Sequence, residues 1–321
     1  MPIAANLPSD AEVSHPPFAL RRLVRSRRGL PGLAAGERDQ LRWSERLLRL
    51  PLVWRQSKGE GVKVAILDTG IDPDHPDLAG AVAASRDFTG EGIEDRNGHG
   101  THCAGIVGAR ENGRGFMGVA PRCRLLIGKV LRGDGGGRLD WLARGIDWAV
   151  GEGADIISMS LGAPRNDPAV HRAVHDALAA GRILVCAAGN AGSLYRNSIA
   201  YPGRYASVIT VAAHDRNGNP SGFSSRGAEL DFMAPGEDIW STWREGGYAK
   251  LSGTSMATPF VAGICALVLA KHREPGEHAT PIANNEDMRH HLLRMAAHPG
   301  HHDEARGHGP LLPFMGFAEA A

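Results

Sequence analysis

Four short apolar runs that alternate with helical patterns limit most strongly how this chain can fold. The runs cover residues 62–68, 124–130, 155–161 and 183–188. Their composition is typical of strands that are buried on both faces, as in parallel sheets. Helical patterns separate the later runs, over residues 139–149 and 168–180. This alternation predicts an α/β fold, a doubly wound and mainly parallel β-sheet with helices on both faces.

Capping residues mark the ends of these elements. Asp167 is an N-cap residue followed by proline, and Gly181 can close the same helix in a left-handed conformation. Further strands are predicted at residues 207–213 and 229–235, and further helices at residues 36–50 and 285–297. In a doubly wound sheet, ligands gather at the carboxyl ends of the strands, where Asp68, Ser160 and Asn190 fall.

Composition excludes several classes of protein. The 321 residues suffice for one large domain or two small ones, and a net charge of +1 predicts neither nucleic-acid nor membrane partners. The four cysteines form no CxxC pair, so we expect buried free thiols and a reducing compartment. The start resembles no signal peptide, and no apolar run approaches the ~18 residues of a membrane span. We therefore expect a cytoplasmic protein, although a chain trimmed of its leader would look the same; the oligomeric state stays open.

The chain divides into three parts by composition. Residues 1–48 contain five prolines and a cluster of arginines, and we interpret them as a partly disordered extension with a solvated basic face. Residues 49–297 are expected to form the folded domain. Residues 298–321 are predicted to be an irregular tail, in which the spacing of the histidines fits no standard zinc site.

A serine wrapped in small residues is the first candidate for chemistry. Ser255 lies in the segment 253–263, and the apolar run 264–270 follows at once. A tight turn that opens into a helix offers free backbone N–H groups and the positive end of the helix dipole, which favour a developing negative charge. Such a serine needs a base and a group that orients the base. His99 lies among glycines in residues 97–105, and Asp68 ends the first apolar run.

These three residue types suffice for acyl transfer. The hydroxyl of Ser255 is too weakly acidic to attack alone, so His99 would take its proton and later return it to the leaving amine. Asp68 would hold the imidazole in the right tautomer and stabilise the imidazolium. The sequence therefore predicts a serine hydrolase with catalytic residues Asp68, His99 and Ser255.

The blocks around these residues closely resemble the three signatures of the subtilisin-like serine proteases, the subtilases. The blocks are Asp68-Thr69-Gly70, His99-Gly100-Thr101-His102 and residues 253–259, and the resemblance covers roughly residues 52–297. The chain order Asp, His, Ser is that of subtilisin and is identified by this resemblance. A fourth block, residues 187–190, resembles the family's oxyanion stretch. The resemblance implies that the Asn190 amide and the Ser255 N–H bind the oxyanion of the tetrahedral intermediate.

The resemblance also implies a cleft in which the substrate, a peptide or an unfolded protein, lies as an extended strand. Its walls would be Gly135, Gly136 and Gly137 on one side and Ser160, Leu161 and Gly162 on the other. Leu139 would line the pocket for the fourth residue before the scissile bond. The first pocket would be bounded by Ser160–Gly162, Ala187, Ala188, Gly189 and Ala200. These pocket residues are small and uncharged, so we expect large apolar or aromatic side chains at the cleaved position.

Two further features follow from the resemblance. Calcium is common in the family, and Asp77 and Asn112 match its side-chain ligands. The carbonyls of Arg110, Arg114 and Phe116 would complete an oxygen shell. Cys103, one helical turn after His99, would place a mercurial-sensitive thiol behind the imidazole, or would simply be a small core residue.

Residues 155–162 and 184–190 look most like the intracellular bacterial subtilisins. In that branch a short N-terminal extension can cover the cleft until it is removed, and we hypothesise that residues 1–48 do so. One alternative is a catalytically silent subtilase fold that binds peptides. A dinucleotide-binding oxidoreductase is a weaker alternative, because the turn after the first strand lacks a G-x-G-x-x-G motif.

Overall fold

A seven-stranded parallel sheet forms the centre of the molecule. The computed structural model describes residues 12–14, 22–25, 43–113, 115–193, 195–274 and 282–317. The sheet has the strand order β10-β9-β8-β7-β3-β5-β4, and every neighbouring pair is parallel. Its strands are β3 (Lys63–Asp68), β4 (Val82–Asp87), β5 (Arg124–Lys129), β7 (Ile156–Met159), β8 (Ile183–Ala187), β9 (Ile209–His214) and β10 (Phe232–Pro235). The predicted α/β fold class is confirmed, and β4 is a strand that the sequence analysis did not predict.

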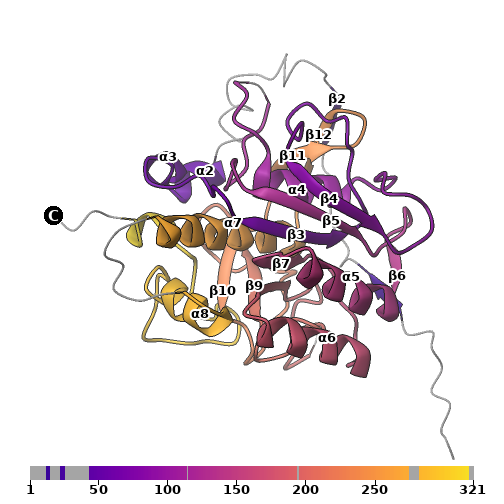
Figure 1. Cartoon of the computed structure of the whole chain (residues 1–321). Coiled ribbons are helices and arrows are strands. Elements are labelled where there is room, and N and C mark those ends of the chain that lie inside the picture. The colour runs from indigo at the N-terminus through magenta and orange to yellow at the C-terminus, as the bar shows by residue number, and fades with distance from the viewer. Residues whose placement is uncertain are drawn as a thin grey trace, which may run out of the picture.

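Helices cover both faces of this sheet (Figure 1). One face carries α4 (His99–Gly108) and α7 (Thr254–Arg273), and the other carries α5 (Leu139–Gly151) and α6 (Pro168–Ala179). The remaining helices among the described residues are α2 (Trp43–Leu47), α3 (Leu50–Val53), α8 (Asn285–Leu293) and the 3-10 turn Pro313–Met315. Alternate residues of β3 enter the two cores, because successive side chains of a strand point to opposite faces. Val64 and Ile66 pack with α4 and α7, whereas Ala65 and Leu67 pack with α5 and α6.

The long helix α7 is buried from Thr254 to Ala270. It is long and apolar enough to span a membrane, but 94% of its most apolar window is buried inside the protein. It packs against β7, β8, β9 and β10. It is therefore a core helix, and it begins at the predicted serine block, so that Ser255 is its second residue.

The capping residues behave as predicted, but the bounds of two predicted helices differ in the described residues. The side chain of Asp167 accepts the N–H groups of Ala169 and Val170, and Gly181 follows the end of α6 with φ 74°. Of the helix predicted at residues 36–50, residues 36–42 lie outside the described residues. The described part belongs to two short helices that are interrupted at Arg49, which has φ 50°. The helix predicted to reach residue 297 ends at Leu293.

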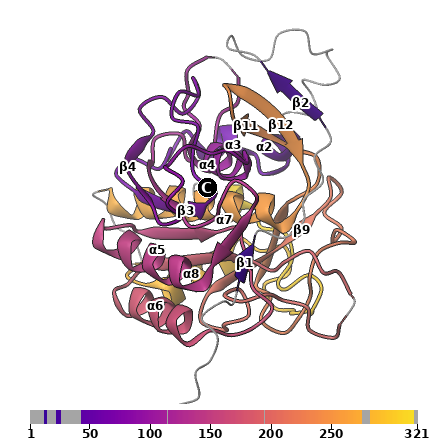
Figure 2. The ribbon, with the colours of Figure 1, turned by 90° about the vertical axis from the view of Figure 1, so that its right-hand side faces the viewer.

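Two small sheets connect the N-terminal region to the domain. Strand β1 (Glu12–Ser14) pairs antiparallel with β6 (Gly136–Arg138). Strands β11 (Ile239–Trp243) and β12 (Gly247–Leu251) form a hairpin, and β2 (Arg22–Arg25) adds to it as a third strand. Figure 2 shows β2 beside β12 at the top of the molecule and β1 lower in the same view. Parts of the predicted extension therefore lie against the domain in defined register.

The segment after residue 297 has little regular structure but packs onto the domain. Leu311 and Phe317 belong to the core that contains α7, and Pro310 forms a parallel bridge with Met233. His302 donates from Nε2 to the carbonyl of Leu230 at 2.8 Å. The described part of this segment, residues 298–317, is thus tied to β10 and its neighbours.

Candidate active site

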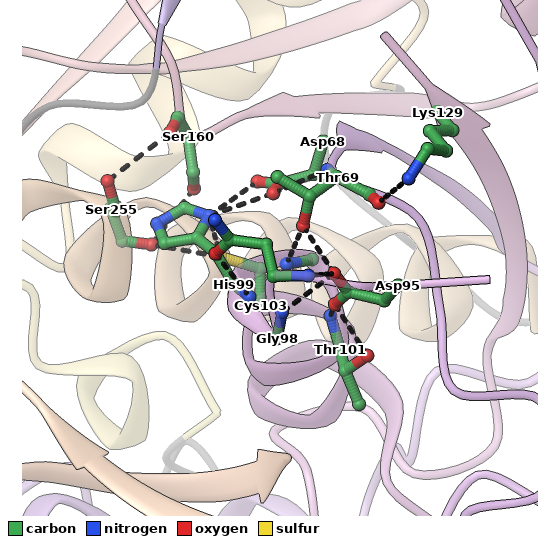
Figure 3. A network of polar contacts seen from close by, with 12 residues as sticks. Asp68, Thr69, Asp95, Gly98, His99, Thr101, Cys103, Lys129, Ser160 and Ser255 are labelled. Atoms are coloured by element: carbon green, nitrogen blue, oxygen red, sulfur yellow. Dashed lines mark hydrogen bonds and ion pairs between the residues drawn. The ribbon is translucent and has the colours of Figure 1, made fainter. Parts of the chain in front are cut away.

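The carboxylate of Asp68 and the imidazole of His99 form the centre of the site (Figure 3). Asp68 ends β3 and His99 begins α4, and both side chains are buried. His99 Nδ1 lies 2.8 Å from Asp68 Oδ1 and 3.0 Å from Oδ2. The backbone N–H of Thr69 donates to Oδ1 at 2.7 Å. With Nδ1 bonded to the carboxylate, Nε2 is the nitrogen left to serve as a base.

The charge of Asp68 sets the basicity of His99. Burial disfavours the imidazolium, but the adjacent carboxylate outweighs burial and holds the pKa of His99 well above its ordinary value. The next histidine behaves in the opposite way. His102 is buried without a carboxylate partner, and burial lowers its pKa to about 3. It bonds through Nε2 to the carbonyls of Ile239 and Ala249, so its role is to tie α4 to the β11–β12 hairpin.

Ser255 lies where the backbone changes from an extended conformation to a helix. Gly253, the residue before α7, has φ 165° and ψ 161°, so the chain is extended there. The ring of His99 lies between Asp68 and Ser255 (Figure 3). The hydroxyl of Ser255 donates to the carbonyl of Ser160 at 3.2 Å, and Ser160 Oγ donates back to the carbonyl of Ser255 at 2.9 Å. The structure therefore brings together all three residues of the predicted triad.

Thr254 orients Asn190, and the sequence analysis did not assign this role. The N–H and the hydroxyl of Thr254 both donate to Asn190 Oδ1, each at 3.0 Å. Because Thr254 holds the amide oxygen of Asn190, the Nδ2 donor points in another direction. It lies beside Gly253, where a Cβ added to the glycine would be 3.2 Å from Nδ2. Nearby, an open hollow of about 350 Å³ is lined by Asn190, Ala191, Gly192, Ser193, Gly222 and Phe223.

Asp95 organises the turn that carries His99, and it was also missed. Its Oδ1 accepts the Thr69 hydroxyl at 2.8 Å and the Gly98 N–H at 2.7 Å, while Oδ2 accepts the N–H and the hydroxyl of Thr101. Thr69 Oγ1 in turn accepts the N–H of Gly100 at 2.9 Å. One buried carboxylate thus joins the residue after Asp68 to the first turn of α4. A carboxylate four residues before a histidine is the sequence signal that could have indicated this role.

A buried lysine supports the same loops from behind. The side chain of Lys129, at the end of β5, is fully buried. Its Nζ donates to the carbonyls of Thr69 at 2.8 Å and Glu94 at 3.1 Å and lies 3.5 Å from Glu91 Oε2. Glu91 also accepts the N–H of Gly133, in the loop that leads to β6. Lys129 therefore links the Asp68 loop, the loop before His99 and the approach to β6.

Cys103 lies behind the imidazole, as its spacing indicated. Its Sγ is 3.8 Å from His99 Nδ1 and 3.5 Å from the carbonyl of Ser255, to which the thiol donates. Burial raises the pKa of Cys103, so the group is a thiol rather than a thiolate at neutral pH. All four cysteines are free and buried, as the composition suggested.

The residues proposed to bound the first pocket lie next to one another. An added Cβ on Gly162 would be 2.7 Å from the Cβ of Ala200, and one on Gly189 would be 3.6 Å from the same atom. Gly189 has φ 108°, a conformation that favours glycine. Gly135 precedes β6, which contains Gly136 and Gly137 and pairs with β1. Leu139 begins α5 and packs in the core with Leu142 and Ile146.

The residues proposed to bind calcium meet, but protein donors already surround the carboxylate. Asp77 accepts hydrogen bonds from Asn112 Nδ2 at 2.9 Å, the Phe116 N–H at 2.8 Å and the Tyr248 hydroxyl at 2.7 Å. Arg110 directs its guanidinium to carbonyls on neighbouring loops, and Arg114 lies outside the described residues. A calcium ion needs six to eight oxygen ligands. In this set the only carboxylate is that of Asp77, and both of its oxygens already accept hydrogen bonds from the protein. The described residues therefore fit a hydrogen-bonded cluster better than a calcium site.

Fold and geometry together define a serine protease site: a serine at a helix N-terminus beside an imidazole that is bonded to a buried carboxylate. A model of the subtilase family matches residues 59–309. The chain therefore belongs to the subtilase family, and it is a serine endopeptidase.

Several relatives support this assignment. The chain is 48% identical over 230 residues to the intracellular serine protease of Paenibacillus polymyxa, and the match covers 69% of this chain and 71% of that protein. It is 42% identical over 243 residues to thermitase from Thermoactinomyces vulgaris, covering 75% of this chain and 86% of that protein. It is also 42% identical over 239 residues to the major intracellular serine protease of Bacillus subtilis strain 168, covering 71% of this chain and 75% of that protein.

Proposed function

We propose that Asp68, His99 and Ser255 hydrolyse peptide bonds through an acyl-enzyme. The observation that carries this proposal is the buried pair of hydrogen bonds between His99 Nδ1 and Asp68, with Ser255 on the other side of the ring. His99 Nε2 takes the proton of Ser255 as its oxygen attacks the substrate carbonyl. The tetrahedral intermediate collapses, the C–N bond breaks, and His99 gives the proton to the leaving amine. Water then attacks the ester with the same base, and Ser255 is released.

Asn190 and the N–H of Ser255 stabilise the oxyanion in this proposal. Support comes from Thr254, which takes the amide oxygen of Asn190 and so directs the amide nitrogen elsewhere. In subtilisin itself, loss of the corresponding asparagine costs about 10²–10³ in kcat, and we expect a loss of that order for Asn190→Ala.

The nucleophile can be tested directly. Ser255→Ala should lose about 10⁶-fold in kcat, the scale known for the nucleophile of subtilisin, and should no longer react with a fluorophosphonate. Ser85→Ala, an exposed serine on the edge strand β4, is the matched control and should react and cleave as before. Normal labelling of the Ser255→Ala protein would overturn the proposal.

The substrate is a peptide or an unfolded protein with a large apolar or aromatic residue before the scissile bond. Gly162, Gly189 and Ala200 support this preference, because they border the pocket without any charge. Sequencing the products from a peptide library would test it, and a majority of cuts after Lys or Arg would contradict it.

The extension covers the cleft before activation. Residues Glu12–Ser14 pair with Gly136–Arg138, a strand that contains two of the three glycines to which we assign one wall of the cleft. An antiparallel strand at this wall takes the place of a substrate. Fresh protein should therefore show a lag before activity, and the N-terminus should shorten during that lag. Intact Met1 in fully active protein would exclude this role, and a chain that never becomes active would favour the silent peptide-binding alternative.

We propose that the enzyme acts inside the cell. Two of the relatives named above are called intracellular, and four free buried cysteines suit a reducing compartment. Fractionation of the source cells would test this location. No step of the proposed mechanism requires a metal ion, a nucleic acid or a membrane.

A further inference from the structure

The outer edge of β12 is a feature that the proposed function leaves without a role. On one side β12 pairs with β11, and on the other side it pairs antiparallel with β2, from Gly247 opposite Arg25 to Lys250 opposite Arg22. We call the backbone of residues 247–250 on the β2 side the β12 edge. An open strand edge binds an extended polypeptide through main-chain hydrogen bonds.

The β12 edge lies close to the nucleophile along the chain. Strand β12 ends at Leu251, and Ser255 is the second residue of α7. The end of β2 nearest to Ser255 in this register is Arg22, and the strand then runs away from it. A polypeptide that leaves the cleft in this direction would continue along the β12 edge.

The two N-terminal strands are close enough for one extended peptide to occupy both ladders. Ser14 is opposite Gly136 at the end of β1, and Arg22 is opposite Lys250 at the start of β2. Eight residue steps separate Ser14 from Arg22, and at most ~3.5 Å per step they span about 28 Å. If β1 stands in for the residues before a scissile bond, β2 stands in for residues well after it.

The β11–β12 hairpin is held rigidly against the helix that carries His99. Thr242 Oγ1 donates to the carbonyl of Thr101 at 2.7 Å, and Ser241 Oγ donates to the carbonyl of His102 at 2.8 Å. On the other side, His75 Nε2 bonds to the carbonyl of Gly247 at 2.8 Å. The β12 edge is therefore fixed relative to the site before any ligand arrives, which lowers the cost of binding.

We propose that the β12 edge is a binding site for an extended segment of the substrate on its leaving-group side, occupied in the uncut chain by residues 22–25. The proposal rests on the proposed protease function. Its ligand is an unfolded polypeptide that is recognised mainly through its backbone, so the site favours long, unfolded substrates over short peptides.

The first test compares two substrates in the full chain. Leu23→Pro/Val24→Pro removes backbone donors from β2 and frees the β12 edge. Leu23→Ala/Val24→Ala, which keeps both backbone N–H groups, is the matched control. One substrate is a short peptide anilide, and the other has the same residues followed by about twelve more after the scissile bond. Both chains also carry Val13→Pro, which weakens the pairing of β1 with β6 and uncovers the cleft. Initial rates should then favour the long substrate about tenfold more in the Leu23→Pro/Val24→Pro chain than in the control, the scale of one or two net hydrogen bonds.

The second test measures binding without cleavage. A labelled peptide of residues 20–28 should bind the Ser255→Ala chain at least about tenfold more tightly when Leu23→Pro/Val24→Pro is also present, because the chain's own strand no longer competes. The same peptide with prolines at positions 23 and 24 keeps its charge and should not bind. Equal binding by the two proteins, or an unchanged substrate ratio, would overturn the proposal. Failure of the proposed function would look different, because the unmodified chain would then never cleave the short anilide.

Discussion

Two buried carboxylates, Asp68 and Asp77, were both predicted to be functional, yet their surroundings give them different roles. Their exposed fractions are 1% and 0%. Asp68 faces His99, a partner that can gain and lose a proton near neutral pH. Asp77 faces Asn112, Phe116 and Tyr248, which donate permanently. Burial and the neighbouring Asp77 raise the pKa of Tyr248, so this hydroxyl also keeps its proton. A buried carboxylate becomes part of the chemistry only when one of its donors can change its charge.

The largest effect that would sharpen this comparison is expected for Asp68→Asn. The amide keeps the shape of the side chain but removes the charge that stabilises the imidazolium, so kcat should fall about 10⁴-fold. His99 must be neutral to act as a base, and Asp68 raises its pKa. The acidic limb of the pH–rate profile should therefore move to lower pH in the variant. A kcat within tenfold of the parent, or a limb that moves upward, would contradict the assignment.

Asp77→Ala should affect stability and spare the chemistry. Three donors lose a charged acceptor in a buried place, so the free energy of unfolding should fall by about 3 kcal/mol, while kcat at low temperature should change less than about twofold. Denaturant unfolding and initial rates measure the two quantities. Because Asp77 is already bonded within the protein, a calcium chelator should leave the midpoint of thermal unfolding unchanged. A large fall of that midpoint with chelator would instead support calcium.

Lys129→Met tests whether the hydrogen bonds that Lys129 donates to the loops behind the site contribute to kcat. The substitution leaves the carbonyls of Thr69 and Glu94 without their donor, and Thr69 adjoins Asp68. We expect kcat to fall about tenfold, the effect of slight misplacement of reacting groups. Lys63→Met is the control, because Lys63 donates to the carbonyl of Glu152 at an exposed place. Equal rates for the two variants would assign Lys129 to stability alone.

The smallest effect is expected for Cys103→Ser. The thiol lies 3.8 Å from His99 Nδ1 but is protonated, so its loss should change kcat less than about threefold. Sensitivity to a mercurial should disappear with it, while Cys123, Cys186 and Cys265 remain as internal controls. An inhibition curve that stays the same after the substitution would place the sensitive thiol elsewhere.

Local sequence predicted well the parts of the fold that local physics determines. The apolar runs became buried parallel strands, and Asp167 and Gly181 ended α6 as their cap preferences require. Elements that depend on distant partners were missed. Strand β4 alternates between intermediate and exposed residues at the sheet edge, and β12 is defined by its pairing with β11. Strands β1 and β2 exist only because the domain offers them an edge to pair with.

For the site, the sequence likewise predicted the residues that stand in local motifs but not the residues that support them from distant segments. Asp68, His99 and Ser255 stand in blocks of small residues with a recognisable order, and the sequence predicted that they would meet, as they do in the structure. Lys129 could not be predicted, because a lysine at a strand end is typical of a surface residue until folding buries it. Asp95 was missed although its position four residues before His99 is a weak signal. Asp77 and Asn112 do meet, but residue types alone do not reveal which donors already occupy a carboxylate.

The burial of α7 limits how such an enzyme can be regulated. Its first residues include Ser255, the proposed nucleophile, and the rest of the helix fills the centre of the protein. A rearrangement that moved Ser255 by shifting α7 would therefore also disturb the core packed around that helix. Under the activation proposed above, a stretch of polypeptide covers the site from outside, and a single cut can remove it. Activation by such a cut is irreversible, and its timing depends on how long the cell keeps the covering segment intact.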